Sequence, residues 1–127
     1  MEGFKLSLLL WVGMGSFLGG VVRFLVFQYV QTIGARSFPW GTMAVNMLGS
    51  LMVGFLLALA EKRLVQEEMR FFLMVGLLGG FTTFSAFSAE TYLMLSRGEF
   101  AKACLYVGLS MVLGPALALA GYRLMSS

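Results

Sequence analysis

Four long apolar stretches, separated by short polar or charged segments, set the pattern of this chain. They cover residues 4–31, 40–60, 71–96 and 100–124. Each is long enough for a helix to cross the hydrocarbon core of a bilayer, which takes about 20 residues. Only Arg23 and Glu90 place a charge well inside a stretch. The pattern predicts an all-α membrane protein, with one domain of four transmembrane helices spanning residues 1–127.

Composition supports a membrane location. Hydrophobic residues make up 59% of the chain and charged residues 12%, against about 45–50% and 25% in soluble domains. The first stretch could alternatively be a cleaved signal peptide. However, its apolar run continues to Val30 with no small-x-small cleavage site after a polar flank, which favours a mature transmembrane helix. We expect a multi-pass protein of a bacterial-type inner membrane.

The residue types that are missing exclude several functions. The chain has no histidine, no aspartate and one cysteine, Cys104, so an intramolecular disulfide, histidine chemistry and an intramembrane carboxylate pair are all excluded. We therefore do not expect an enzyme. The net charge of +3 is scattered over loops and ends, which does not form the basic patch of a nucleic-acid-binding protein.

The lysines and arginines also bear on membrane orientation. With four spans, one side carries Lys5, Lys62, Arg63, Arg70 and Arg123, and the other Arg36, Arg97 and Lys102. Five against three is a weak bias for the positive-inside rule. Charge alone leaves open a weak N-in orientation or insertion both ways. Dual insertion would allow an antiparallel dimer with a two-fold axis in the membrane plane.

The first helix carries small residues and a buried charge. Gly15-x-x-x-Gly19 and Ser16-x-x-x-Gly20 form adjacent ridges that allow close helix packing, either within the four spans or between two copies. Arg23 follows on the same helix. At this depth an arginine faces a bundle interior or a water-filled cavity, where it would attract anions, or snorkels to the interface.

Two other helices carry polar stripes with i, i+4, i+8 spacing, which puts each stripe on one helix face. The stripes are Thr42, Asn46 and Ser50 in the second helix, and Tyr106, Ser110 and Gly114 in the fourth. Asn46 either bonds another helix or faces a ligand with its donor and acceptor. Pro115 is expected to interrupt the fourth helix and to free a carbonyl one turn earlier.

The third stretch is too long for one straight span. As a single helix, residues 71–96 would measure about 39 Å, against about 30 Å of hydrocarbon. A break at Gly79-Gly80 would absorb part of the excess. Main-chain carbonyls released at such a break are good ligands for a hard cation, and at a two-fold axis two copies could share one ion.

Aromatic and hydroxyl side chains alternate directly after this glycine pair. Phe84 and Phe87 are i, i+3 neighbours, and Thr82, Ser85 and Ser88 form the adjacent ridge. Lipid contact for the rings and bonding of the hydroxyls to i−4 carbonyls are the simpler interpretations. Because ring edges are positive, rings beside hydroxyl donors also suit a small anion.

At these residues the chain resembles a known family. The run from Gly76 through Gly79-Gly80-Phe-Thr82-Thr83-Phe84-Ser85-Ala-Phe87-Ser88 to Glu90 resembles the third-helix signature of the Fluc (CrcB) fluoride channels. Gly41-Thr42-Met-Ala-Val-Asn46-Met-Leu-Gly49 is similar to that family's second-helix motif, and Gly19-Gly20-x-x-Arg23 to its first-helix motif. The likeness extends over essentially the whole chain.

The resemblance implies an antiparallel, dual-topology homodimer with two fluoride pores at the subunit interface. It implies a structural sodium ion (Na+), not transported, that main-chain carbonyls of Gly79 and Thr82 hold at the dimer centre. Phe84 and Phe87 match rings that line the fluoride path edge-on, and Asn46 matches an asparagine needed for permeation. Further pathway positions are Thr42, Thr83, Ser85, Tyr106, Ser110 and Arg23. Gly114-Pro115 departs from relatives that carry a serine there.

Fluoride is small, strongly hydrated and a strong hydrogen-bond acceptor, so a pore must replace its water with close donors. Passive export of cytoplasmic fluoride is the function that the residues and the resemblance both indicate. Two alternatives remain at this point. A proton-coupled multidrug exporter needs a deep carboxylate, for which Glu90 is the sole candidate. A non-transporting assembly subunit would use only the small-residue ridges.

Overall fold

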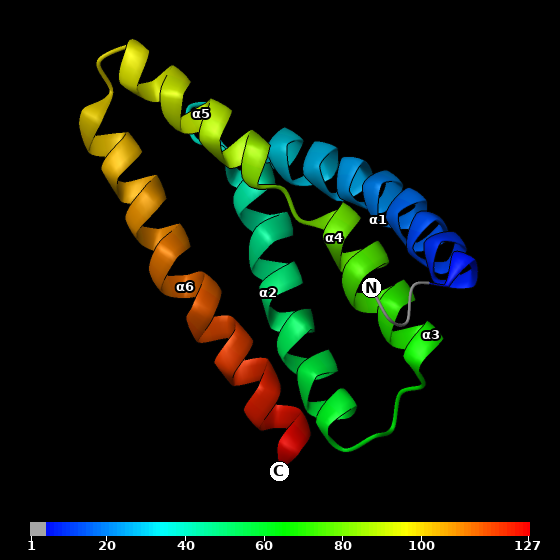
Figure 1. The fold of residues 1–127 in the computed structure, drawn as a ribbon. Coiled ribbons are helices and arrows are strands. Elements are labelled where there is room, and N and C mark those ends of the chain that lie inside the picture. The colour runs from blue at the N-terminus through cyan, green and yellow to red at the C-terminus, as the bar shows by residue number, and fades with distance from the viewer. Residues whose placement is uncertain (1–4) are drawn as a thin grey trace.

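The computed structural model describes residues 5–127, and every regular element in that range is helical (Figure 1). The elements are α1 (Leu6–Ile33), α2 (Trp40–Glu61), α3 (Glu67–Arg70), the wider π-helical segment η1 (Phe71–Leu78), α4 (Gly79–Phe81), α5 (Phe84–Ser96) and α6 (Phe100–Ser126). Segments α3, η1, α4 and α5 follow one another and together make the third long segment.

Four segments are long and apolar enough to cross a membrane: Leu6–Ile33, Trp40–Glu61, Glu67–Ser96 and Phe100–Ser126. The prediction of an all-α chain with four membrane-spanning helices is confirmed. Phe4, where the first stretch was predicted to begin, lies outside the described residues. The third segment begins at Glu67 rather than at Phe71, because Glu67 and Glu68 occupy the first turn of α3, where negative charge is favourable to a helix.

Helices α2 and α6 lie side by side along their length, and α1 crosses against η1 and α4 (Figure 1). Glycines allow both contacts. A Cβ added at Gly54 of α2 would lie 2.0 Å from the carbonyl oxygen of Ala118, and one at Gly121 of α6 would lie 2.2 Å from that of Leu51. The two backbones are therefore in direct contact, as small residues permit between membrane helices.

The glycine ridge of α1 packs against another segment of the same chain. A Cβ at Gly19 would lie 2.1 Å from the carbonyl oxygen of Leu77, and one at Gly15 would lie 2.3 Å from that of Phe72. On the other side of this contact, a Cβ at Gly80 would lie 2.6 Å from the Ser16 carbonyl oxygen. The Gly15–Gly19 ridge is thus occupied by the third segment of the same chain.

The third segment leaves the helical conformation at two threonines. Thr82 (φ −86°, ψ 158°) and Thr83 (φ −148°, ψ 115°) are extended, and α5 begins at Phe84. The predicted position of the break, Gly79-Gly80, is wrong, because Gly79 is helical at φ −60° and ψ −38°. Gly80 is a glycine because its contact with α1 leaves no room for a side chain. The β-branched threonines that follow favour extended backbone.

Pro115 does not interrupt α6, which runs without a break from Phe100 to Ser126. That prediction is also wrong. The helix tolerates the proline, whose missing N–H leaves the carbonyl of Met111 without its usual donor four residues on. Only the stretch of α6 that contains Ser110 and Gly114 is affected by this missing hydrogen bond.

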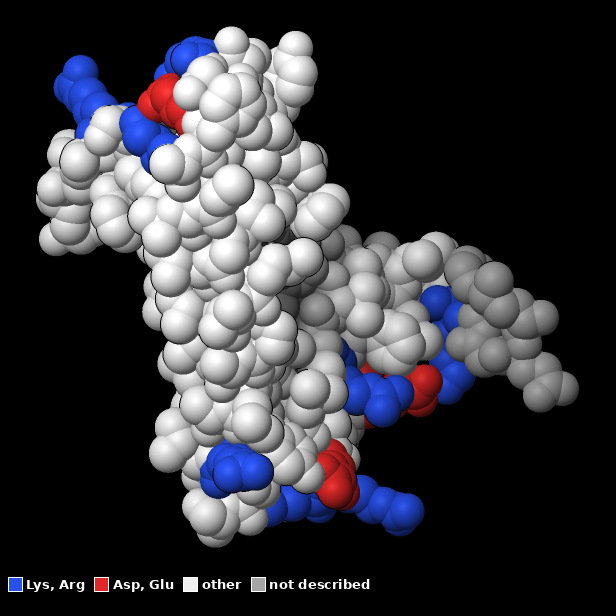
Figure 2. Space-filling model, turned by 90° about the vertical axis from the view of Figure 1, so that its left-hand side faces the viewer, with Lys and Arg blue, Asp and Glu red and all other residues white. Residues whose placement is uncertain are grey.

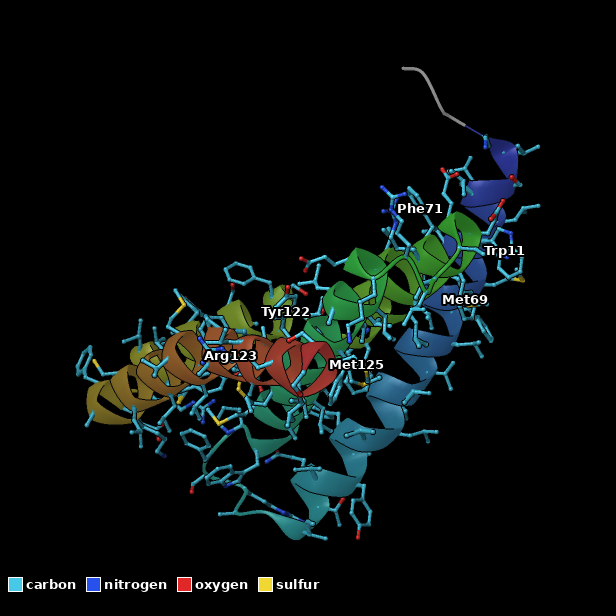
Figure 3. All side chains as sticks on the ribbon, turned by 90° about the horizontal axis from the view of Figure 1, so that it is seen from below. Trp11, Met69, Phe71, Tyr122, Arg123 and Met125 are labelled. Atoms are coloured by element: carbon cyan, nitrogen blue, oxygen red, sulfur yellow. The ribbon has the colours of Figure 1, made fainter. Side chains whose placement is uncertain are left out.

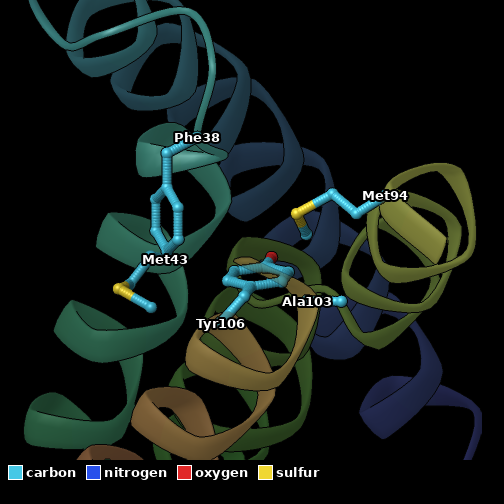
Figure 4. Close-up of a cluster of buried hydrophobic side chains, with 5 residues drawn as sticks. All are labelled: Phe38, Met43, Met94, Ala103 and Tyr106. Carbon is cyan, nitrogen blue, oxygen red and sulfur yellow. The ribbon is translucent and has the colours of Figure 1, made fainter. Parts of the chain in front are cut away.

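The buried core of the described chain is small. Phe38, Met43, Met94, Ala103 and Tyr106 form one buried cluster where α2, α5 and α6 meet (Figure 4). On the face shown in Figure 2, charged side chains gather at the top, at the bottom and on one side, and a broad uncharged surface lies between them. Seen from below in Figure 3, Tyr122, Arg123 and Met125 mark the end of α6, where the Lys62 ammonium donates a 2.7 Å hydrogen bond to the Met125 carbonyl.

Candidate ion pathway

An open groove of about 430 Å³ lies between α2, α6 and the extended threonines. Its apolar walls include Met47, Met74, Leu78 and Met111. Seven of the predicted fluoride-pathway and sodium positions line it: Asn46, Gly79, Thr82, Thr83, Phe84, Phe87 and Ser110. The groove therefore brings together residues from three separate parts of the chain.

The side chain of Asn46 binds the main chain of Thr83 at two points. Its Nδ2 donates to the Thr83 carbonyl oxygen at 3.0 Å, and its Oδ1 accepts from the Thr83 N–H at 2.8 Å. The extended Thr83 has no neighbouring strand to pair with in residues 5–127, so the Asn46 carboxamide satisfies both its N–H and its carbonyl oxygen. Backbone polar groups at membrane depth need such partners.

Thr83 also starts the helix that follows. Its hydroxyl accepts a hydrogen bond from the Ala86 N–H at 3.1 Å, which satisfies one of the donors left over at the start of α5. The Thr83 side chain thus fixes the first turn of α5, and with it the direction of Phe84 and Phe87.

The carbonyls around the break have different partners. The Leu78 oxygen accepts from the N–H of Thr82 at 3.0 Å and from its hydroxyl at 2.9 Å. The Gly80 oxygen accepts from Nε of Arg23 at 2.9 Å. The carbonyl oxygens of Gly79 and Thr82 accept no hydrogen bond from residues 5–127. These two oxygens are available to another ligand.

Arg23 is not placed in the groove. It is half-buried and binds Gly80 across the α1–α4 contact, so it replaces the helical donor that the Gly80 carbonyl loses at the break. A charged hydrogen bond of this kind contributes about 1.5–3 kcal/mol. Arg23 thus stabilises the chain where the third segment leaves the helical conformation, and it does not line the groove.

Phe84 and Phe87 stand next to each other on the groove wall. Their ring centroids are 5.8 Å apart with an interplanar angle of 37°. Phe84 is 77% exposed, whereas Phe87 is half-buried and packs on Tyr106 with ring centroids 5.0 Å apart. One ring is therefore held by the core and the other is presented outward.

Behind Phe87 lies a buried polar cluster formed by Thr42, Glu90 and Tyr106. The Thr42 hydroxyl donates to Oε2 of Glu90 at 3.0 Å, and the Tyr106 hydroxyl donates to Oε1 at 3.3 Å. Thr42 and Tyr106 are fully buried. The two hydroxyls provide donors for both carboxylate oxygens, as a half-buried carboxylate requires.

Thr42, Ser85, Tyr106 and Arg23 were expected on the pathway but do not line the groove. Ser85 is exposed at the start of α5, with its hydroxyl 3.3 Å from that of Thr83. Sequence reasoning did not identify the groove methionines or the partners of Glu90. Glu90 lies three residues after Phe87 on the same helix face. This spacing could have indicated that Glu90 lies close to the groove.

Comparison with known proteins identifies related chains. Residues 10–122 match the family model described as "CrcB-like protein, Camphor Resistance (CrcB)". The chain is 46% identical over 115 residues to a "Fluoride-specific ion channel FluC" of Hydrogenovibrio crunogenus, covering 90% of this chain and 87% of that one. Proteins of the same name from Idiomarina loihiensis (42% identity, 91% and 90% covered) and Thermus thermophilus (46%, 89% and 89%) are similar over comparable lengths.

Proposed function

This chain belongs to the CrcB family, and on that basis we propose that it is a fluoride-specific ion channel that lets cytoplasmic fluoride leave the cell passively. Its relatives are named as ion channels, so the chain is not an enzyme. It is a multi-pass membrane protein with four candidate spans, and we place it in the inner membrane of a bacterial-type cell.

The observation that carries this proposal is the groove at the extended threonines. It combines the Asn46 amide, the Ser110 hydroxyl and the rings of Phe84 and Phe87 in one open space. Hydrogen-bond donors and positive ring edges are the groups that can replace water around a small anion. Within residues 5–127, neither carboxylate nor ammonium groups line it, so an ion would be neither repelled by an acid nor trapped by a base.

A dimer of antiparallel subunits would complete the pathway. The groove is open, and the Phe84 ring is 77% exposed in one subunit. A second copy would close the open side and cover that ring. Two-fold symmetry would then give two equivalent pores, and dual insertion is compatible with the weak five-to-three charge bias.

A structural sodium ion fits the chemistry at the break. The carbonyl oxygens of Gly79 and Thr82 accept no hydrogen bond from the described residues, and carbonyl oxygens are suitable ligands for a hard cation. Two copies would supply four such oxygens. The described part of the chain contains no group of three acidic, histidine or cysteine side chains that could hold a metal. When bound, the ion would supply positive charge between the carbonyl dipoles of two subunits.

Two alternative functions are less well supported. An exporter would need Glu90 to exchange protons, but both of its carboxylate oxygens accept hydrogen bonds from hydroxyls. The small-residue ridge expected of an assembly subunit packs within the chain. The names of the relatives favour the channel over both.

A flux assay tests the proposal directly. The purified protein is reconstituted into liposomes loaded with potassium fluoride, and efflux is started with a potassium ionophore and followed with a fluoride electrode. We expect rapid fluoride release and little chloride release under matched conditions. Equal release of both halides, or fluoride release no faster than from protein-free liposomes, would overturn the proposal.

A further inference from the structure

A second cavity, of about 170 Å³, lies at the far end of α5 from the threonine break. The end of α1, the connection between α1 and α2, and the second half of α5 enclose it. Five of its ten lining residues carry polar or charged side chains: Gln31, Arg36, Ser37, Glu90 and Arg97. We refer to it as the arginine mouth.

The connection that carries Arg36 is held in place from both ends. Nε2 of Gln31 donates to the Phe38 carbonyl at 3.1 Å, and Oε1 of the same amide accepts from the Gly41 N–H at 3.0 Å. The Phe38 ring is buried and meets Tyr106 edge-on at 5.5 Å. Arg36 therefore extends from an anchored segment of the chain.

The charge at the arginine mouth is positive on balance. Arg36 and Arg97 line the mouth together with one carboxylate, Glu90, whose oxygens accept hydrogen bonds from Thr42 and Tyr106. Arg97 also lies 3.6 Å from Glu99, which Lys102 contacts in turn. Arg36 makes no ion pair with any residue of the described range 5–127.

The arginine mouth is connected to the groove through contacting side chains. Glu90 lines the mouth and accepts a hydrogen bond from Tyr106. Tyr106 packs on Phe87, with ring centroids 5.0 Å apart, and Phe87 lines the groove. The two cavities thus lie at opposite ends of one line of polar and aromatic side chains.

We propose that the arginine mouth captures hydrated small anions, with Arg36 and Arg97 concentrating them at this end of the pathway. Its volume is that of several water molecules, at about 30 Å³ each, so an anion held here keeps its hydration shell. A cleft with an excess of one sign of charge raises the local concentration of the opposite ion and its rate of entry. This inference rests on the proposed channel function and concerns capture rate, not selectivity.

The test is initial fluoride efflux of Arg36→Gln and Arg97→Gln in liposomes, at low and high ionic strength. Screening extends about 30 Å at 0.01 M salt and about 3 Å at 1 M. We expect each variant to lose about twofold to tenfold of the wild-type rate in 0.01 M salt, and to match wild type in 1 M sodium gluconate. The fluoride-to-chloride ratio should not change.

Three further variants make the test specific. Arg36→Lys keeps the charge and should keep the rate. Glu99→Gln removes the carboxylate beside Arg97 and should raise the low-salt rate. Arg123→Gln, at the far end of α6 and outside both cavities, should have no effect. Gel filtration of each variant checks that the fold is intact.

The outcomes separate the two proposals. Wild-type protein that releases no fluoride overturns the channel function itself. Wild-type release with unchanged rates in both glutamine variants at low salt overturns the arginine mouth alone. A loss that is equal at both salt concentrations also overturns it, because electrostatic capture must be screened.

Discussion

Asn46 and Thr83, 37 positions apart in the chain, form a two-point hydrogen-bonded pair on the wall of the groove, with N···O distances of 3.0 and 2.8 Å. The pair joins α2 to the only non-helical residues within the third segment of the described structure. Asn46 therefore holds the extended residues and lines the groove, and its amide nitrogen carries a second hydrogen besides the one donated to Thr83.

Asn46→Asp is expected to lower fluoride efflux sharply. The carboxylate loses both amide hydrogens and adds a negative charge where an anion would pass. The loss of one hydrogen bond to a charged group, about 1.5–3 kcal/mol, corresponds to about tenfold to a hundredfold in rate. Efflux from liposomes is the measurement, and gel filtration checks that the variant keeps the size of the wild-type protein.

Ser50→Ala is the matched control. Ser50 lines the same groove from the same helix, but its hydroxyl already donates to the Asn46 carbonyl at 2.8 Å. We expect its efflux to stay near that of wild type. An Asn46→Asp protein that has the wild-type size and conducts as fast as wild type would remove this amide from the ion path.

The two phenylalanines are expected to differ in their effects on stability. Phe84→Ile should reduce efflux with little change in the melting temperature of the subunit, because the Phe84 ring is 77% exposed. Phe87→Ile should reduce both efflux and stability, since the Phe87 ring packs on buried Tyr106. Liposome efflux and thermal unfolding in detergent measure the two effects separately.

Phe17→Ile provides the control for this comparison. Phe17 is 72% exposed on α1 and lies outside both cavities. Its substitution should leave efflux unchanged. If Phe84→Ile conducts as Phe17→Ile does, the exposed ring contacts only lipid or a partner and takes no part in conduction.

The apolar stretches predicted the four helices because each one reflects a local property, the need for about 20 apolar residues to cross a bilayer. Helical spacing also placed Thr42 and Asn46 on one face of α2. The structure shows that their side chains bind different partners. Thr42 donates to Glu90, whereas Asn46 binds Thr83. The face was predictable, and the partners were not, because they come from another segment.

The position of the break depended on information that is not local. Glycine pairs often mark kinks, but Gly80 lies against Ser16 of α1, and its carbonyl is held by Arg23, 57 residues away. Once α1 supports the glycines in a helix, the extended residues fall at Thr82-Thr83, where Asn46 can bind them. A one-dimensional pattern does not contain these contacts.

The polar cluster behind the groove should contribute to stability. Thr42→Val and Tyr106→Phe each remove one hydroxyl that donates to Glu90, and each should cost about 1–3 kcal/mol because a half-buried carboxylate oxygen loses its donor. Thr32→Val is the control, since the Thr32 hydroxyl is exposed and bonds only the Gln28 carbonyl of its own helix. Equal melting temperatures for all three variants would contradict the prediction.

Removing sodium tests the proposed cation. If the carbonyls of Gly79 and Thr82 hold Na+ between two copies, replacing all sodium with N-methyl-D-glucamine should weaken the dimer and reduce efflux. Thr82→Ser keeps the main-chain carbonyl and should keep the dependence on sodium. Dimers that remain intact and conduct equally well in sodium-free buffer would rule out a structural ion at this site.

Two neighbouring glycines of α1, Gly19 and Gly20, are expected to differ in their tolerance of alanine. Gly19→Ala places a methyl group 2.1 Å from the Leu77 carbonyl, so α1 and η1 must move apart, whereas a Cβ at Gly20 meets nothing within 4 Å. Overpacking of this kind costs about 1–3 kcal/mol. Gly20→Ala should instead leave the subunit as stable as wild type or slightly more so, because alanine favours a helix over glycine by about 1 kcal/mol. Thermal unfolding in detergent compares the two, and a larger loss at Gly20 than at Gly19 would show that the small-residue ridge packs through its other face.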